Sequence, residues 1–212
     1  MRRCRNAGPS PLPLSHLRLR RRQRLRLDQH ALAREYVLFD DLFSDSEVSV
    51  DGHSWCDAAI ATDFNQRSWI HRYSRHGQLP GNDEMERPAN GFLWDLCRRH
   101  GISFKAYGEG AGRVPSQDLG TWPNGRDPVK VEGWIKDLHV AEKTGILPRF
   151  MIMSLGENHT KGTRPGAPTP EACVGSNDLA LGRLVEAASH SRFWNQMAIF
   201  IIEDDTQNGP DH

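Results

Sequence analysis

Four short apolar runs stand out along the chain, at residues 36–39, 102–107, 149–155 and 198–202. Each run is short and flanked by turn residues, a pattern typical of strands that are buried in a sheet. The last run, AIFII, is the most continuous of the four and predicts the most buried strand. The sequence therefore predicts four strands spread over nearly the whole chain.

Helices are predicted between these runs. Ser54 followed by Asp57 resembles a capping box and predicts a helix through about Trp69. Other start and stop signals predict further helices: one closing near Arg34, one over 92–99 stopped by Gly101, one from Asp127-Pro128 to near Gly145, and one opened by Thr169-Pro170. In the last helix an apolar face is predicted from Leu181, Leu184, Val185 and Ala188. Turn-rich residues predict irregular structure over 72–90 and 108–126.

Strands that alternate with helices predict an α/β fold with a mainly parallel sheet covered by helices on both faces. Ligands of such sheets bind beyond the carboxyl ends of the strands. Acids follow all four predicted strands, as Asp40-Asp41, Glu109, Glu157 and Glu203-Asp204-Asp205. A single loop carboxylate is common, but four at one edge predict a cation site.

Charge divides the chain into two parts. Residues 1–28 hold nine arginines and one acid, whereas residues 29–212 hold 18 basic residues and 26 acids. The first part predicts a basic tail that is disordered or not native to the domain; the alternative is an arm for nucleic acid or anionic lipid. The acidic remainder suits divalent cations rather than a polyanion, so nucleic acid is not expected as a partner.

Membrane and disulfide classes are not favoured. No apolar run approaches the roughly 18 residues needed to cross a bilayer, and the start has no apolar segment of a secretory signal. The four cysteines are far apart, with no CxxC pair, and are expected to be buried or incidental thiols: Cys4, Cys56, Cys97 and Cys173.

Candidate chemistry begins at the last predicted strand. Adjacent carboxylates repel each other unless a cation neutralises them, so Glu203-Asp204-Asp205 followed by Asp211-His212 predicts a metal site; the alternative is a solvated turn. His159 after the preceding strand is expected at the same edge, with polar surface as its alternative. Carboxylates and imidazole suit Mn²⁺, Zn²⁺, Mg²⁺ or Ca²⁺ without distinguishing them.

A second group of candidates precedes a predicted helix, in VSVDGHSW at residues 48–55. A helix N-terminus favours a phosphate group. Asp51, His53 and a nearby serine hydroxyl are residues of the kind used in acid–base or nucleophilic catalysis. The alternative is that these side chains only cap the helix.

Several strings resemble the bacterial phosphoesterase family of the alkaline-phosphatase-like superfamily, which includes phospholipase C-like and acid-phosphatase-like members. The two most specific are EVSVDGHSW at residues 47–55 and EDDTQNGPDH at residues 203–212. Four more strings are similar in the same order: HALAREYVLFDDLF, FLWDLCRRHGISFKAYGE, HTKGTRPGAPTPEA and NDLALGRLVEA. The resemblance covers residues 29–212 and leaves out residues 1–28.

The resemblance implies a three-layer αβα fold, bound divalent metal, and hydrolysis of a phosphomonoester or phosphodiester. It implies metal-ligand roles for Asp204, Asp205, His159, Asp211 and His212. By the same resemblance, the segment that holds Asp51 and His53 takes the place of the catalytic segment.

This chain departs from the family pattern at four places. Asn158 replaces an expected aspartate, and Ser54 replaces an asparagine. An upstream Glu-Asn strand and a histidine beyond His212 are absent, so the chain is expected to be incomplete at both ends and slow in hydrolysis. The alternatives are a non-catalytic metal-binding remnant and, less favoured, a polyanion-binding protein.

Overall fold

The structure is a computed structural model that describes residues 28–44, 48–76, 82–110 and 112–205. Helix α1 spans Asp28–Glu35, as the signal near Arg34 predicts. The predicted basic tail lies outside the described residues except for Asp28. The predicted ligands Asp211 and His212 also lie outside them.

Two parallel strands form the sheet that the structure describes. Strand β1 spans Phe104–Tyr107 and strand β2 spans Phe150–Met153, with Phe104 opposite Phe150. Parallel neighbours need a long crossover, and helix α6, Asp127–Thr144, lies in the connection. The strands predicted at 102–107 and 149–155, and their parallel direction, are therefore confirmed.

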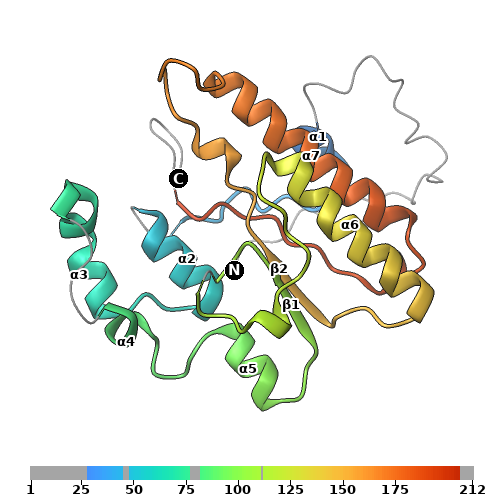
Figure 1. The fold of residues 1–212 in the computed structure, drawn as a ribbon, viewed down its shortest axis with the longest axis horizontal. Coiled ribbons are helices and arrows are strands. Elements are labelled where there is room, and N and C mark those ends of the chain that lie inside the picture. Colours follow the sequence, from blue (N-terminus) through green and yellow to red (C-terminus); the bar gives the residue numbers. More distant parts are fainter. Residues whose placement is uncertain (1–27, 45–47, 77–81, 111, 206–212) are drawn as a thin grey trace.

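Helices cover both faces of this strand pair (Figure 1). Side chains alternate between the faces of a strand, and each face packs in its own core. On one face the strands pack with α5, Leu93–Arg99, through Phe104, Ala106, Phe150, Ile152, Trp94 and Cys97. On the other face they pack with α6 and α7, Pro170–His190, through Tyr107, Met151, Met153, Trp134, Leu138 and Leu184. The described chain is thus α/β, with its strands in the middle.

Helices α6 and α7 form where their capping signals predict. Pro128 stands in the first turn of α6, and Gly145 ends it in the left-handed conformation with φ 76°. The Thr169 side chain accepts a hydrogen bond from the Ala172 N–H at the start of α7. The predicted apolar face is confirmed, with Leu181, Leu184 and Ala188 buried and Val185 partly buried. Among the described helices, none is long and apolar enough to span a membrane.

The helix predicted to begin at Ser54 is wrong in its boundaries. Helix α2 already starts at Ser49 and spans Ser49–Ala58, and α3 follows at Asp63–His71. Ala59 adopts the left-handed conformation with φ 56°, which breaks the helix. Thr62 then caps α3 by accepting from the Asn65 N–H.

The irregular segments also contain short helical pieces. A π-helical turn at Arg72–His76 and helix α4, Asn82–Glu86, interrupt the segment predicted as loop over 72–90. A 3₁₀ turn at Ser116–Asp118 lies within the irregular segment 108–126. Such short pieces carry too few apolar residues for a helical period to be read from the sequence.

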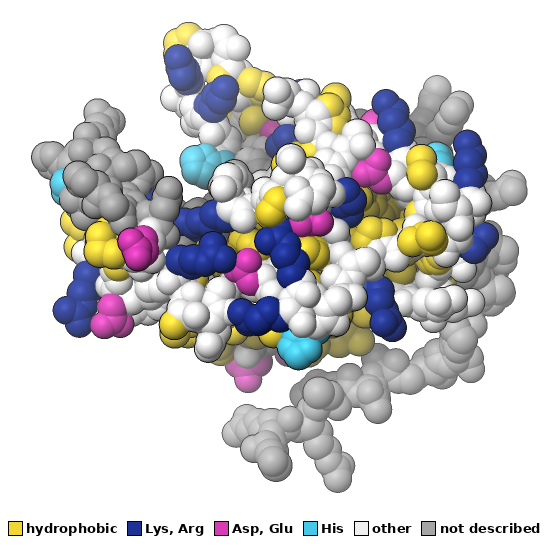
Figure 2. All heavy atoms as spheres, turned by 60° about the horizontal axis from the view of Figure 1, so that its bottom comes forward, with side chains coloured by type: hydrophobic (Ala, Val, Ile, Leu, Met, Phe, Trp, Pro, Cys, Tyr) yellow, Lys and Arg dark blue, Asp and Glu magenta, His cyan; other side chains and the backbone are white. Residues whose placement is uncertain are grey.

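The strands predicted at 36–39 and 198–202 are absent from the described sheet. Both segments are non-helical and solvent-exposed, with Val37 80% and Phe200 79% exposed. A strand requires a partner whose backbone groups it can hydrogen-bond, and apolar composition does not supply one. The side chains of these segments are among the exposed hydrophobic residues of the molecule. More generally, one face of the molecule shows hydrophobic side chains between charged ones (Figure 2).

Candidate functional site

Helix α2 and the segment after residue 202 meet through two pairs of side chains. The Ser49 hydroxyl donates to Asp205 Oδ2 at 2.7 Å, and His53 Nε2 lies 3.3 Å from Asp204 Oδ2. Ser49 and His53 are four residues apart and so share one face of the helix. Consecutive aspartates thus contact consecutive turns of α2, which brings two of the predicted metal ligands beside a predicted catalytic residue.

A third acid, Glu109, faces the other nitrogen of the same imidazole. Glu109 follows β1, and its Oε1 lies 3.1 Å from His53 Nδ1. The hydrogen bond to Glu109 is the main cause that raises the pKa of His53 to about 9. Burial acts in the opposite direction, and the charges of Glu109 and Asp204 add to the effect of the hydrogen bond. His53 therefore carries a positive charge at neutral pH.

Asp57 lies behind Glu109, one turn of α2 further from the helix start. Asp57 is 3% exposed, and its carboxyl group lies close enough to that of Glu109 for the two to interact. Burial and the neighbouring Glu109 charge raise the pKa of Asp57 to about 8. Burial would also raise the pKa of Glu109, but hydrogen bonds and the positive charge of His53 lower it. The two acids therefore differ in charge at neutral pH.

Asp51 is not part of the contact between His53 and Asp204. It precedes His53 by two residues, and residues so spaced do not face each other on a helix. Its carboxyl group is buried, and burial raises its pKa while the charge of Arg72 lowers it. Among the described residues, Asp51 Oδ1 has no hydrogen-bond partner. The two predicted catalytic residues thus lie in different surroundings.

Ser54 has a structural part in the same helix. Its hydroxyl donates to the Val50 carbonyl and accepts from Asn65 Nδ2, both at 2.9 Å. The side chain is buried and ties α2 to α3. The hydroxyl proton is donated within the helix and the side chain is buried, so the structure gives Ser54 a packing role.

His159 lies in the loop after β2, at the carboxyl edge of the sheet where Glu109 also follows its strand. It is exposed and ends the 3₁₀ turn Glu157–His159. The imidazole beside Asp204 is that of His53. The predicted proximity of His159 to Asp204 therefore stays a prediction.

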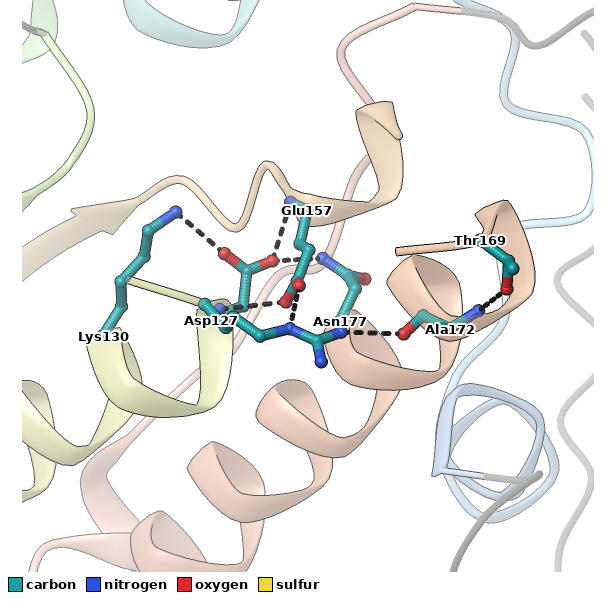
Figure 3. Close-up of polar contacts among 7 residues, drawn as sticks. Asp127, Lys130, Glu157, Thr169, Ala172 and Asn177 are labelled. Carbon is teal, nitrogen blue, oxygen red and sulfur yellow. Dashed lines mark hydrogen bonds and ion pairs between the residues drawn. The ribbon is translucent and has the colours of Figure 1, made fainter. Parts of the chain in front are cut away.

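A buried polar cluster fixes the start of this loop (Figure 3). Asp127 is fully buried at the first turn of α6, and Oδ2 accepts from the Glu157 N–H at 2.8 Å and from Asn177 Nδ2 at 3.0 Å. Oδ1 accepts from Lys130 at 2.8 Å. In return, Glu157 accepts from the Asp127 N–H and from Arg126. Hydrogen bonds to a charged group stabilise by roughly 1.5–3 kcal/mol each, so the cluster anchors the loop that holds His159.

Glu109 and Asp57 are the partners that sequence reasoning missed. Glu109 was visible as an acid after a predicted strand, but nothing in the local pattern pairs it with His53. The sequence pattern predicts Asp57 as part of a helix cap, because it places the helix start at Ser54. Glu109 meets His53 and Asp57 only when the segment after β1 lies beside α2.

The donor types near Asp204 suit a divalent cation. Carboxylate oxygens prefer such ions, and Asp204 and Asp205 are both half-buried. Within the described ranges, no group of three or more His, Cys, Asp or Glu side chains is arranged to hold a metal ion. The set predicted from the sequence includes Asp211 and His212, which lie outside those ranges.

Comparison with known proteins adds no relative. No family model matches the chain. Searches of the curated proteins and of the solved structures returned no match either.

Proposed function

We propose that this chain is a metal-dependent phosphoesterase of the alkaline-phosphatase-like superfamily that hydrolyses a phosphate ester. The observation that carries the proposal is the contact between the two most specific strings of the resemblance. Ser49 and His53 belong to the first string, and Asp204 and Asp205 belong to the second. Two segments about 150 residues apart would not need to meet if their likeness to a catalytic family were accidental.

The layered arrangement gives further support. Parallel strands covered by α5 on one face and by α6 and α7 on the other are compatible with the three-layer fold that the resemblance implies. Ligands of such folds bind beyond the carboxyl ends of the strands, and Glu109 follows β1 at that end. The proposed site therefore lies where this architecture places sites.

Each side chain has a specific part in the proposed reaction. Asp204 and Asp205 would hold the divalent cation, which would supply positive charge to the phosphoryl oxygens. His53 is protonated at neutral pH and, as water bonds to phosphorus and the ester P–O bond breaks, gives its proton to the leaving oxygen as general acid. Glu109 holds the His53 ring from behind. The Ser49 hydroxyl, in the first turn of α2, donates to Asp205. We assign this hydroxyl to the position that faces the phosphate group of the substrate.

The test combines metal binding with turnover. We expect Mn²⁺, Zn²⁺, Mg²⁺ or Ca²⁺ to raise the melting temperature of the chain, because an ion that binds the folded form stabilises it by mass action. Asp204→Asn should reduce that rise. Asp63→Asn is the matched control. The Asp63 side chain is 89% exposed, and Asp63 is distant in sequence from Asp204. Hydrolysis of para-nitrophenyl phosphate and of its bis-ester should depend on the same ion.

Each outcome separates the alternatives. A metal-dependent rise without turnover would identify a non-catalytic metal-binding remnant. No rise with any of the four ions, together with no turnover, would refute the proposal. A salt-dependent gel shift that is lost on deleting residues 1–28 would instead favour polyanion binding.

A further inference from the structure

Two carboxyl groups meet behind His53 in surroundings with little access to water. Asp57 is 3% exposed, and the side chain of Glu109 is 12% exposed. The two carboxyl groups lie close enough that each shifts the pKa of the other, upward for Asp57 and downward for Glu109. Ionised carboxylates only accept hydrogen bonds, so a bond between two carboxyl groups requires a proton on one of them.

The neighbours of the two groups decide which one holds the proton. Glu109 Oε1 accepts from His53 Nδ1 and from the Gly110 N–H, each at 3.1 Å, and these donors favour its charged form. Asp57 Oδ1, in contrast, is buried and has no hydrogen-bond partner among the described residues. An unpartnered buried oxygen is far less costly on a neutral carboxyl group than on a charged one.

The two positive groups near Asp57, His53 and Arg113, favour its charged form, but each of them faces another carboxylate. On its own helix, His53 is positive and already faces Glu109, and the Cys56 thiol has a pKa raised by burial to about 11. From the loop after β1, the charge of Arg113 favours an ionised Asp57, but the Arg113 guanidinium is paired with Glu86. Asp204 adds a further negative charge near His53.

We propose that Asp57 is a protonated carboxylic acid in the folded protein and that it donates its proton to Glu109 as a positioning residue. The donated hydrogen bond fixes the Glu109 carboxylate, which in turn accepts from His53 Nδ1. The ring is thereby held with Nε2 toward Asp204. Of the four groups in line, Asp57 is neutral, Glu109 and Asp204 are negative and His53 is positive. The role of Asp57 in positioning His53 for catalysis rests on the proposed function. The proton shared between Asp57 and Glu109 does not rest on it.

Infrared spectroscopy of the full chain, without metal or substrate, tests the shared proton. We expect a carbonyl-stretch band of a protonated carboxyl group at neutral pH, which shifts when aspartate is labelled with ¹³C at its side-chain carboxyl carbon. The band should be lost on titration through about pH 8. Asp57→Asn should lack it, and Asp63→Asn should keep it. Labelling assigns the band to an aspartate in the unmodified chain, and Asp51→Asn, which should keep the band, excludes Asp51, whose pKa burial also raises.

The ring of His53 gives a second readout. Asparagine retains an N–H donor toward Glu109, so Asp57→Asn should keep the wild-type ¹⁵N signals of His53, whereas Asp57→Leu should change them. A band that is absent in the wild type, that survives Asp57→Asn, or that moves with labelled glutamate would overturn the proposal. A negative hydrolysis assay would leave these spectra unaffected, so failure of the proposed function is recognised separately.

Discussion

The charge on His53 depends on acids from separate parts of the chain. Nδ1 faces Glu109, which follows β1, and Nε2 faces Asp204, which follows the apolar run 198–202. An opposite charge at hydrogen-bonding distance favours the charged ring, and burial favours the neutral ring. Here the acids prevail and raise the pKa of His53 to about 9. The protonated form of His53 at neutral pH therefore depends on the neighbouring acids and not on the residue type alone.

This raised pKa predicts that the protein loses stability as the pH rises from 6.5 to about 9. In that window the unfolded chain has released the His53 proton while the folded chain retains it, so raising the pH favours unfolding. The stabilisation is fully present below pH 6.5. Melting temperatures measured across this window should fall in the wild type.

His53→Gln separates this contribution from that of Asp57. Asp57 has a pKa raised from 3.8 to about 8, so it lowers stability as the pH rises between those values. The variant should therefore retain a decline below about pH 8 and lose the decline above it. An identical decline above about pH 8 in the wild type and His53→Gln would contradict the assignment to His53.

At the scale of elements, glycines inside α6 and α7 have opposite surroundings. A Cβ atom added at Gly133 of α6 would lie 2.3 Å from the Thr121 carbonyl oxygen, whereas one added at Gly175 of α7 would meet nothing within 4 Å. Helix propensity alone favours alanine over glycine by roughly 1 kcal/mol at both positions. The close approach of α6 to the loop at Thr121 therefore decides the difference.

We expect Gly133→Ala to destabilise the protein by about 1–3 kcal/mol, the usual cost of overpacking. Gly175→Ala should instead stabilise it by about 0.5–1 kcal/mol. Urea unfolding of both variants provides the free energies. If Gly133→Ala stabilises as much as Gly175→Ala, then α6 does not pack against the loop as described.

At the scale of the whole molecule, two apolar segments remain exposed. Residues 36–39 and 198–202 hold side chains that are 39–80% exposed where they are large and apolar. Exposed extended apolar segments are sites of association between chains. The contacts of Ser49 with Asp205 and of His53 with Asp204 hold the end of the second segment against α2.

Phe200→Lys is expected to reduce self-association with little change in stability. The Phe200 side chain is 79% exposed, and surface substitutions usually change stability by less than about 0.5 kcal/mol. Light scattering measures association, and urea unfolding measures stability. Leu184→Lys is the contrasting variant, since Leu184 is 5% exposed in the core and a charge there should unfold the protein. A loss above about 2 kcal/mol for Phe200→Lys would mean that 198–202 is the buried strand its composition predicts.

The sequence by itself determined the elements whose signals are local. Helix α6 carries its own start and stop residues, and helix α7 carries its start residues and an apolar stripe, so these features were predictable from neighbouring residues. The runs that became β1 and β2 are apolar and are joined by a connection long enough for a parallel crossover. The α/β class and the parallel direction follow from that order. The acids that follow the strands were visible for the same reason.

Only the tertiary structure decided which residues meet. His53 and Glu109 are 56 residues apart, and Ser49 and Asp205 are 156 residues apart. No local period relates positions at such separations, and ordering a chain over them requires packing between complete elements. The same reason explains why residues 36–39 and 198–202 do not form strands in the described sheet. Their apolar side chains indicate a preference for burial, but a strand forms only where another strand presents its backbone hydrogen-bonding groups.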